Sequence, residues 1–322
     1  MSKTRTPAHP EAVAIGVDIG ATAIKAGLVE LHGNLLQRFQ QPSPRTAAAL
    51  RGFVHSVRKC SPAPVLGVGI GCKGVIDSAT TRISRLPGDL HFIEGLTLHE
   101  LVDAGELPVC ADNDARAALV AEVLWGAARG LRNVVLVTLG TGVGGAALVD
   151  GIIVRGASGA ACHLGHVTVD IRGDLCICGN YGCLETCFSS RAIESRYFAH
   201  LHRASPAQLS VDVDGHLPST EAIFQAAADG DPSARRVLDL AFESLAGSLA
   251  SFLHVFDPEL LILGGNIAAA PQLLALLQAE VARRTSLLLG REVPIVLQSL
   301  VGYGGVAGAA GLVFLQQHLL TI

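Results

Sequence analysis

The chain has 322 residues, half of them hydrophobic and only 16% charged, with a formal net charge of −4 at pH 7. This composition excludes a disordered protein and fits a compact α/β chain with room for two units of ordinary domain size. The weak negative charge gives no electrostatic signal for nucleic-acid binding.

The amino terminus, MSKTRTPAHPEA, lacks the apolar core that a secretory signal needs. No stretch of 18 apolar, uncharged residues suggests a membrane span. We therefore expect a cytoplasmic protein, in which thiols stay reduced and clustered cysteines favour a metal over a disulfide.

The first part of the chain predicts an antiparallel meander followed by alternating helices and strands. Gly20 and His32-Gly33-Asn34 separate three short apolar runs, which is typical of hairpins. The expected strands are Val13–Asp18, Ala23–Val29, Leu35–Gln40, Val65–Ile70 and Leu107–Cys110. The expected helices are Thr46–Lys59 and Ala115–Arg129, the second of them ended by Gly130.

The same pattern starts again after a shift of 120 residues. This shift places Val17-Asp18-Ile19-Gly20 on Val137-Thr138-Leu139-Gly140, and Leu28-Val29-Glu30 on Leu148-Val149-Asp150. One offset at both ends of a hairpin indicates two duplicated halves. The second half adds strands at Val134–Leu139, Ala146–Val149, Leu260–Leu263 and Val293–Leu297. Its expected helices are Ser190–Arg203, Ser219–Asp229, Ala234–Phe256, Gln272–Leu289 and Gly304–His318.

Turns that contain glycine and threonine occupy equivalent places in the two halves. Asp18-Ile19-Gly20-Ala21-Thr22 can present successive N–H groups to a phosphate, while Asp18 orients hydrated Mg²⁺. The stretch from Thr138 to Gly145 lets the backbone approach a phosphate closely, and Thr141 can donate its hydroxyl. Neither turn is a Walker A loop or a GxGxxG motif. Ordinary turns are the alternative, but their paired occurrence favours a two-sided phosphate clamp.

Asp112-Asn113-Asp114 directly precedes the helix expected at Ala115. The start of a helix needs one side-chain cap, and any of these three residues can supply it. Three capping residues in a row leave a surplus, so a carboxylate is available for chemistry. The neighbouring Arg116 is expected on the surface.

A single imidazole and three thiols lie close together between Ser158 and Glu185. They are His166, Cys176, Cys178 and Cys183. A Cys₃His set is the usual composition of a closed, structural zinc site, and the glycines between the cysteines let the loop fold back on itself. A chance cluster of buried cysteines or a disulfide loop is the alternative.

The pattern around these residues, Gly165-His166 followed by CxCGxxGCxE, resembles the signature of the ROK family of repressors, open reading frames and sugar kinases. The resemblance extends from Asp18 to the glycine-rich segment near Gly308. It implies an α/β chain with the duplicated actin-like, sugar-kinase (ribonuclease H-like) fold, in which nucleotide and sugar bind in a cleft between two lobes. The implied small lobe comprises residues 11–113 and about 304–322, and the large lobe comprises 114–303.

The resemblance also implies ATP-dependent phosphorylation of a hexose, at the 6-hydroxyl of glucose or a close relative. Asp114 would be the general base. The implied sugar contacts come from Gly88, Asn113, Asp114, His163, His166 and Glu185. The implied MgATP contacts come from Asp18, Gly20, Thr22, Lys25, Thr138, Gly140, Thr141, Gly142, Gly264 and Gly265. A structural Zn²⁺ and a homodimer complete these expectations, with no nucleic-acid or membrane partner.

Two other kinds of function stay open. The chain can be an N-acetylhexosamine (GlcNAc or ManNAc), allose or fructose kinase of the same family. It can also be a sugar-responsive regulator or a non-catalytic sugar-binding protein. A repressor needs a helix-turn-helix before the kinase-like part, and only 17 residues precede Asp18. Both phosphate loops and Asp114 argue against the non-catalytic alternative.

His163 departs from the family pattern. The pattern has Gly-Glu-x-Gly-His, where this chain has Cys162-His163-Leu164-Gly165-His166. A carboxylate accepts from two hydroxyls, whereas a neutral imidazole offers one acceptor and one donor. We expect altered sugar contacts at this position. The alternatives are that His163 points elsewhere, or that it replaces His166 as the metal ligand.

Overall fold

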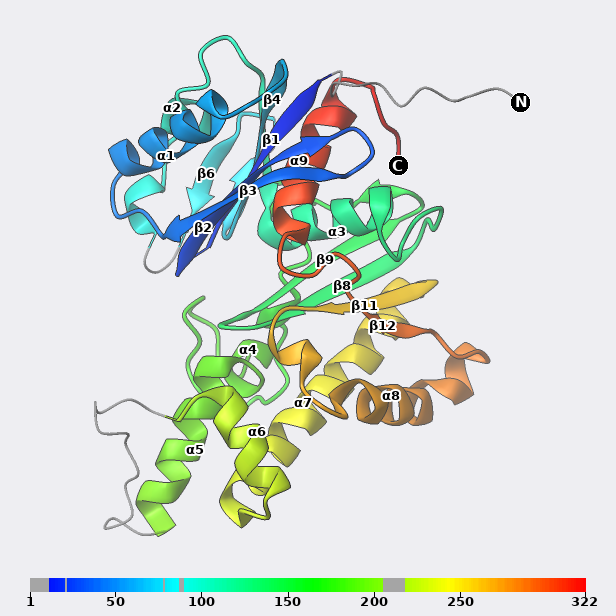
Figure 1. Ribbon diagram of the computed structural model, residues 1–322. Coiled ribbons are helices and arrows are strands. Elements are labelled where there is room, and N and C mark those ends of the chain that lie inside the picture. Colours follow the sequence, from blue (N-terminus) through cyan, green and yellow to red (C-terminus); the bar gives the residue numbers. More distant parts are fainter. Residues whose placement is uncertain (1–11, 21, 78, 87–89, 205–217) are drawn as a thin grey trace. The chain divides into compact units, whose positions relative to one another are not determined.

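The structure is a computed structural model that describes residues 12–20, 22–77, 79–86, 90–204 and 218–322. The chain divides into two compact units (Figure 1). Unit 1 comprises residues 1–131, 151–161 and 298–322, and unit 2 comprises 132–150 and 162–297. The helix that begins at Asp114 and residues 151–161 thus belong to unit 1.

Unit 1 contains a five-stranded sheet in the order β3-β2-β1-β4-β7. The strands β1, β4 and β7 are parallel to one another, and β1-β2-β3 form the expected antiparallel meander. Their bounds are Val13–Ile19 (β1), Ala23–Glu30 (β2), Leu35–Pro42 (β3), Val65–Cys72 (β4) and Val109–Asn113 (β7). A separate hairpin joins Val75–Asp77 (β5) to Arg82–Arg85 (β6).

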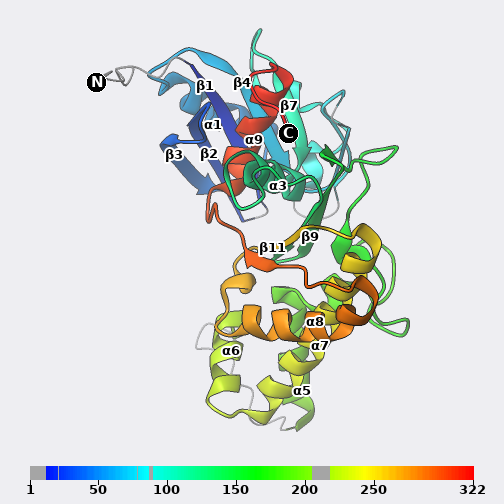
Figure 2. The same cartoon turned by 90° about the vertical axis from the view of Figure 1, so that its right-hand side faces the viewer.

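Helices cover both faces of this sheet (Figures 1 and 2). On one face lie α1 (Ala47–Lys59) and α2 (Leu98–Val102), and on the other lie α3 (Asp114–Trp125) and α9 (Gly304–Gln316). The contact between α9 and the sheet is very close, since a Cβ added at Gly69 would lie 1.7 Å from the carbonyl oxygen of Ala309. A Cβ at Gly308 would likewise lie 1.6 Å from the carbonyl oxygen of Ala117 in α3. Only glycine therefore allows α9 to pack between the sheet and α3.

Unit 2 repeats this strand pattern. Its sheet has the order β10-β9-β8-β11-β12, which matches β3-β2-β1-β4-β7 position by position. The bounds are Val134–Leu139 (β8), Val143–Val149 (β9), Ile152–Ile153 (β10), Leu260–Gly264 (β11) and Ile295–Leu297 (β12). The matching order confirms the duplication inferred from the 120-residue shift.

The helices of unit 2 pack around its longest member, α7 (Pro232–Phe256), which contacts α4, α5, α6 and α8. Their bounds are Leu184–Cys187 (α4), Ser190–Ala204 (α5), Thr220–Ala228 (α6) and Leu273–Leu289 (α8). Single 3₁₀ turns lie at His91–Ile93 (η1), Leu164–His166 (η2) and Ile267–Ala269 (η3).

Several sequence-based boundaries were wrong, among them the start of β9, which begins at Val143 and not at Ala146. The strand expected at Leu107–Cys110 runs instead from Val109 to Asn113, so it reaches the acidic triplet. The helix expected to continue to Arg129 ends at Trp125. Its end has a clear cause, because the buried carboxylate of Glu122 accepts the N–H of Ala127 at 2.8 Å and also bonds Ser299 and Leu300.

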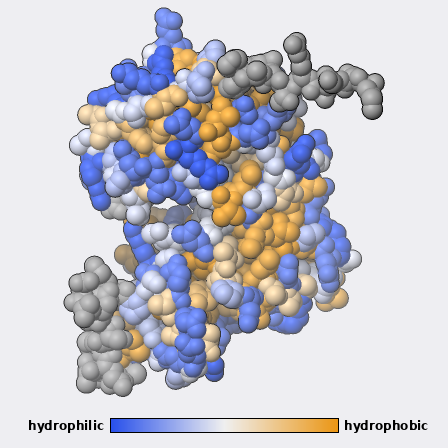
Figure 3. Space-filling view, viewed as in Figure 1, coloured by the Kyte–Doolittle hydropathy of each residue, from blue (hydrophilic) through white to orange (hydrophobic). Residues whose placement is uncertain are grey.

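Among the described residues, none of the helices combines the length and the apolar character that crossing a bilayer requires. In the view of Figure 3, apolar side chains gather near the strands of the second sheet, whereas α5 and α6 present mainly polar ones. The exposed apolar side chains of the chain include Ile152, Leu287 and Val301.

Candidate active site and metal site

The candidate catalytic residues of unit 1 lie at one edge of its sheet. In the parallel register Ile19 pairs with Cys72, and Cys72 pairs with Asn113. Asp18 and the Asn113-Asp114 pair therefore both lie at the carboxyl ends of parallel strands. This is the edge at which open α/β sheets bind their ligands.

The cap of α3 is Asn113, whose Oδ1 accepts the N–H of Ala115 at 3.0 Å. Asp114 occupies the first helical position, and its Oδ1 also accepts from Ala115, at 2.9 Å. Since Asn113 alone suffices as a cap, the carboxylate of Asp114 is the surplus group that the sequence indicated.

Burial raises the pKa of both carboxyl groups. For Asp18 the pKa is raised to about 6, mainly by burial and further by the charge of Asp114. For Asp114, burial likewise raises the pKa, while the positive charges of Lys73 and Arg116 act in the opposite direction. A carboxylate with a raised pKa is a better proton acceptor, which suits a general base.

The turn between β1 and β2 is held firmly. The N–H of Gly20 donates to the carbonyl of Ala23 at 3.1 Å, and the hydroxyl of Ser43 donates to the carbonyl of Gly20 at 2.8 Å. Thr22 is exposed on this turn. Lys25 pairs with Asp18 across the hairpin, and its Nζ donates to the carbonyl of Gly302 at 3.0 Å.

Arg116 is not on the surface, and that expectation was wrong. Its side chain is 1% exposed and pairs with the fully buried Asp112 one helical turn earlier. The same guanidinium donates to the carbonyls of Gly159 at 3.0 Å and Ala161 at 3.2 Å. Arg155 bonds the second oxygen of Asp112 at 2.8 Å. These bonds to Arg155, Gly159 and Ala161 fix residues 155–161 against the start of α3.

Arg116→Ala is expected to destabilise unit 1 by about 3–5 kcal/mol, because it leaves the buried Asp112 with only the partly exposed Arg155 as a partner. Chemical denaturation measures this loss. The matched control is Arg283→Ala, which breaks the solvent-screened pair of Arg283 and Glu280 and should cost far less than Arg116→Ala. Equal effects of the two substitutions would contradict the structural role of Arg116.

The phosphate-loop candidates of unit 2 also share one sheet edge. Thr138 pairs with Gly264 across the parallel β8 and β11, so both loops leave the sheet at the same place. Gly265 has a φ of +85°, and an added Cβ would lie 2.2 Å from the carbonyl oxygen of Leu139. Gly140 closes its turn by donating to the carbonyl of Gly142 at 3.0 Å.

Glu185 has a structural contact that the sequence did not indicate. Its Oε2 accepts the N–H of Val143 at 2.9 Å, directly beside Gly142. An added Cβ at Gly142 would lie 2.4 Å from the same oxygen. Glu185 therefore ties the segment after the metal site to the Gly140-Thr141-Gly142 turn.

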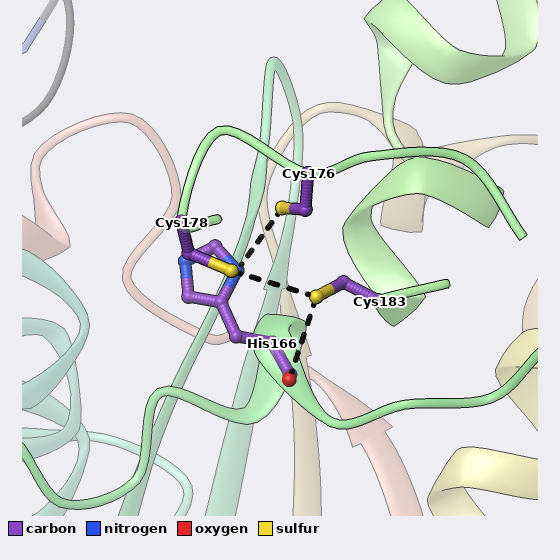
Figure 4. A group of neighbouring side chains, drawn as sticks. All are labelled: His166, Cys176, Cys178 and Cys183. Carbon is purple, nitrogen blue, oxygen red and sulfur yellow. Dashed lines mark hydrogen bonds between the residues drawn. The ribbon is translucent and has the colours of Figure 1, made fainter. Parts of the chain in front are cut away.

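The four predicted metal ligands converge (Figure 4). The ligand atoms of His166, Cys176, Cys178 and Cys183 all lie within 4.8 Å of one another. Sγ of Cys178 is 3.6 Å from Sγ of Cys183, and Sγ of Cys176 is 3.5 Å from Nδ1 of His166. Zn–S bonds of about 2.3 Å and a Zn–N bond of about 2.0 Å at tetrahedral angles give about 3.8 Å and about 3.5 Å for these separations. The donor set thus fits a tetrahedral zinc ion.

The backbone of the metal loop is shaped for this convergence. Gly182 has a φ of +64°, and an added Cβ would lie 1.6 Å from the carbonyl oxygen of Asp170. The N–H of Cys176 donates to the carbonyl of Asn180 at 2.7 Å, which closes the turn between the cysteines. Cys183 directly precedes α4, so the loop also sets the position of Glu185 in the first turn of that helix.

His163 precedes η2, and its ring centroid lies 6.1 Å from that of His166. Among the described residues, the imidazole that lies with the three cysteines is that of His166 and not that of His163, which favours His166 over the rival ligand assignment. Cys162, where the family pattern has glycine, adopts a φ of +61°. Gly88 lies outside the described residues.

Comparison with known proteins agrees with the resemblance noted above. The model of the ROK family matches residues 14–316. The chain is 32% identical over 315 residues to a glucokinase of Thermotoga maritima, covering 94% of this chain and 98% of that protein. It is 32% identical over 277 residues to an N-acetylmannosamine kinase of Escherichia coli, covering 84% of this chain and 88% of that one.

Among solved structures, the chain is similar to a ROK family glucokinase from Streptomyces griseus in complex with glucose and AMPPNP. The TM-score is 0.76 at 30% identity, with 93% of this chain and 98% of that chain covered. The expectation of an α/β chain with the duplicated, actin-like sugar-kinase fold is therefore confirmed.

Proposed function

Because this chain belongs to the ROK family, we propose that it is an ATP-dependent kinase of a hexose, acting on the 6-hydroxyl of glucose or a close relative. The observation that carries this proposal is the start of α3, where Asn113 caps the helix and desolvation raises the pKa of the half-buried Asp114. The relatives named glucokinase support glucose as the sugar.

In the proposed reaction Asp114 accepts the proton of the primary hydroxyl as its oxygen attacks the terminal phosphoryl group in line. Asp114 can act as a base because Asn113 also accepts the N–H of Ala115, so the cap of α3 does not depend on the carboxylate of Asp114. The sugar would be held by the side chains and backbone of Asn113, His163, His166, Glu185 and Gly88. Bound MgATP supplies the phosphoryl group and the charge that stabilises its transfer.

The nucleotide would be held from both halves of the chain. In unit 1 the candidates are Asp18, Gly20, Thr22 and Lys25. In unit 2 they are Thr138, Gly140, Thr141, Gly142, Gly264 and Gly265. The firmly bonded turn at Gly20 and the glycines that leave β8 and β11 support this assignment, because rigid turns can present N–H groups without further ordering.

We propose a structural role for zinc at His166, Cys176, Cys178 and Cys183. Four protein ligands close the coordination shell, so no water would be activated on the ion. Burial raises the pKa of the Cys183 thiol to about 12, and zinc would stabilise the thiolate that coordination requires. The hydrogen bond that Glu185 accepts from the N–H of Val143 would then hold the phosphate turn against the ordered metal loop.

An N-acetylmannosamine kinase activity is the second candidate, because the relative of that name matches most of the chain. A purely regulatory function is disfavoured by the surplus carboxylate of Asp114. We also place the protein in the cytoplasm, where the clustered thiols would stay reduced. We propose a homodimer as well, with the adjacent exposed leucines Leu287 and Leu288 of α8 as candidate interface residues.

A coupled assay of ADP release tests the proposal, with MgATP and a panel of glucose, mannose, allose, fructose, GlcNAc and ManNAc. We expect turnover with glucose or a close relative. Turnover restricted to ManNAc would favour the second candidate, and no turnover with any sugar of the panel would contradict both.

His163→Glu is expected to shift the hexose preference or to lower the KM for glucose, because a carboxylate accepts from two hydroxyls and imidazole from one. The zinc content should not change, since His166 is the imidazole of the metal cluster. The measurement is KM across the same panel, with elemental analysis of each preparation. An unaltered KM for every sugar would show that this position does not contact the substrate.

A further inference from the structure

Lys73 lies at the same sheet edge as the proposed base. It directly follows Cys72, the last residue of β4, and Cys72 pairs with Asn113 on β7 and with Ile19 on β1. β4 thus lies between β1, which carries Asp18, and β7, which carries Asn113. A side chain just beyond its end belongs to the group of residues around Asp114.

Contacts of the residues on both sides of Lys73 fix the position of its backbone. The Nδ2 atom of Asn113 donates to the carbonyl of Gly74 at 3.3 Å. A Cβ built on Gly71 would lie 3.7 Å from the Cα atom of Asp114. The segment from Gly71 to Gly74 therefore runs directly alongside Asn113 and Asp114.

The ammonium of Lys73 differs from the other cations nearby in its bonding partners. Lys25 is bound to the carbonyl of Gly302, and Arg116 is bound to Asp112 and two carbonyls. Lys73 is half-buried, and within the described part of the chain no hydrogen bond or ion pair to its ammonium is found. Its positive charge is therefore the one not already committed to another group.

Asp114 needs such a charge. Its neighbours include the carboxyl of Asp18 and the thiol of Cys72, which burial keeps neutral by raising its pKa. Burial opposes ionisation of Asp114, and the hydrogen bond from the N–H of Ala115 favours it most. Among the nearby charged side chains, Lys73 favours ionisation more strongly than Arg116 does. A general base must be ionised to accept a proton, so the ammonium favours the reactive form.

We infer that Lys73 is a positioning residue of the proposed kinase site, whose ammonium holds the carboxylate of Asp114 in its ionised form. The inference rests on the proposed function for the role of Asp114 as the base. The contacts that place Lys73 are independent of that function.

The first test is the pH profile of kcat/KM for the preferred hexose. Lys73→Met should move the acidic limb upward by about one pH unit, since an opposite charge near a carboxyl lowers its pKa by about one unit or more. Lys73→Arg should restore most of the wild-type profile. Lys59→Met, at the exposed end of α1, is the control and should change nothing. An unmoved acidic limb, or an equal loss at every pH, would overturn the inference.

The second test needs no catalytic activity. A double-mutant cycle compares the unfolding of wild type, Lys73→Met, Asp114→Asn and the double variant at pH 8. Lys73→Met should raise the unfolding constant about tenfold when Asp114 is present, which corresponds to one pKa unit of interaction. In the Asp114→Asn background this effect should vanish. The same change in both backgrounds would overturn the inference, even if the sugar panel showed no kinase activity.

Discussion

Asp114→Asn is expected to lower kcat for hexose phosphorylation by about 10²–10⁴, because an amide cannot take the proton of the attacking hydroxyl. The fold should survive, since Asn113 caps α3 and an Asn side chain at position 114 can still accept the N–H of Ala115. Steady-state kinetics on the preferred sugar measure the effect. The KM for MgATP should change little.

The thermal stability of the Asp114→Asn variant is the control for its loss of activity. The pKa of Asp114 in the folded protein is raised above its unfolded value, so ionising it at neutral pH disfavours the folded state. Asp114→Asn removes that cost, and the Tm at pH 8 should stay the same or rise. Asp239→Asn, an exposed change on α7, should leave both kcat and Tm unaltered. A near-normal kcat for Asp114→Asn would mean that Asp114 is not the base.

Loss of the metal ligand Cys178 is expected to have the second large effect. Cys178→Ser should abolish the binding of about one zinc per chain and destabilise unit 2, because the binding free energy of a structural ion is also folding free energy. Zinc contributes about 10–16 kcal/mol of folding free energy in small zinc domains. If Cys178→Ser removes about 4 kcal/mol of folding free energy, Tm should fall by about 10 °C. Elemental analysis and thermal unfolding measure the two effects.

Cys60→Ser is the matched control, because Cys60 is an equally exposed free cysteine in unit 1. It should change neither the zinc content nor the Tm. Glucose affinity should fall with Cys178→Ser, since Glu185 loses the support of the metal loop. A metal-free preparation that stays folded and fully active would show that zinc has no structural role.

Much of the fold could be predicted because its local patterns are strong. Gly20 and His32-Gly33-Asn34 mark the turns of the first hairpins, and the 120-residue shift within the sequence indicates the duplication that the two sheet orders share. The missed strands and α-helices, β5, β6, β10, α2 and α4, are short and have no periodicity of their own. The helix α3 ended early because a buried side chain, that of Glu122, accepts the N–H of Ala127, which no periodic pattern reveals.

The metal site could be predicted because its ligands are close in sequence and rare in type. The burial of Arg116 could not be predicted, since a charged residue four positions from Asp112 usually forms an exposed helical pair. Its partners Gly159 and Ala161 are more than 40 positions away, and only the fold brings them to it. Lys73 was missed for a related reason, because a single lysine between strands carries no pattern. Its proximity to Asp114 depends on the pairing of β4 with β7.

The most direct test of the proposed activity compares glucose with 6-deoxyglucose as acceptors, at saturating MgATP and equal enzyme concentration. The two sugars differ only in the hydroxyl from which Asp114 would take the proton. We predict rapid release of ADP and formation of glucose 6-phosphate with glucose, and release of ADP no faster than the sugar-free background with 6-deoxyglucose. Sugar-dependent phosphorylation of both sugars, or of neither, would contradict the account.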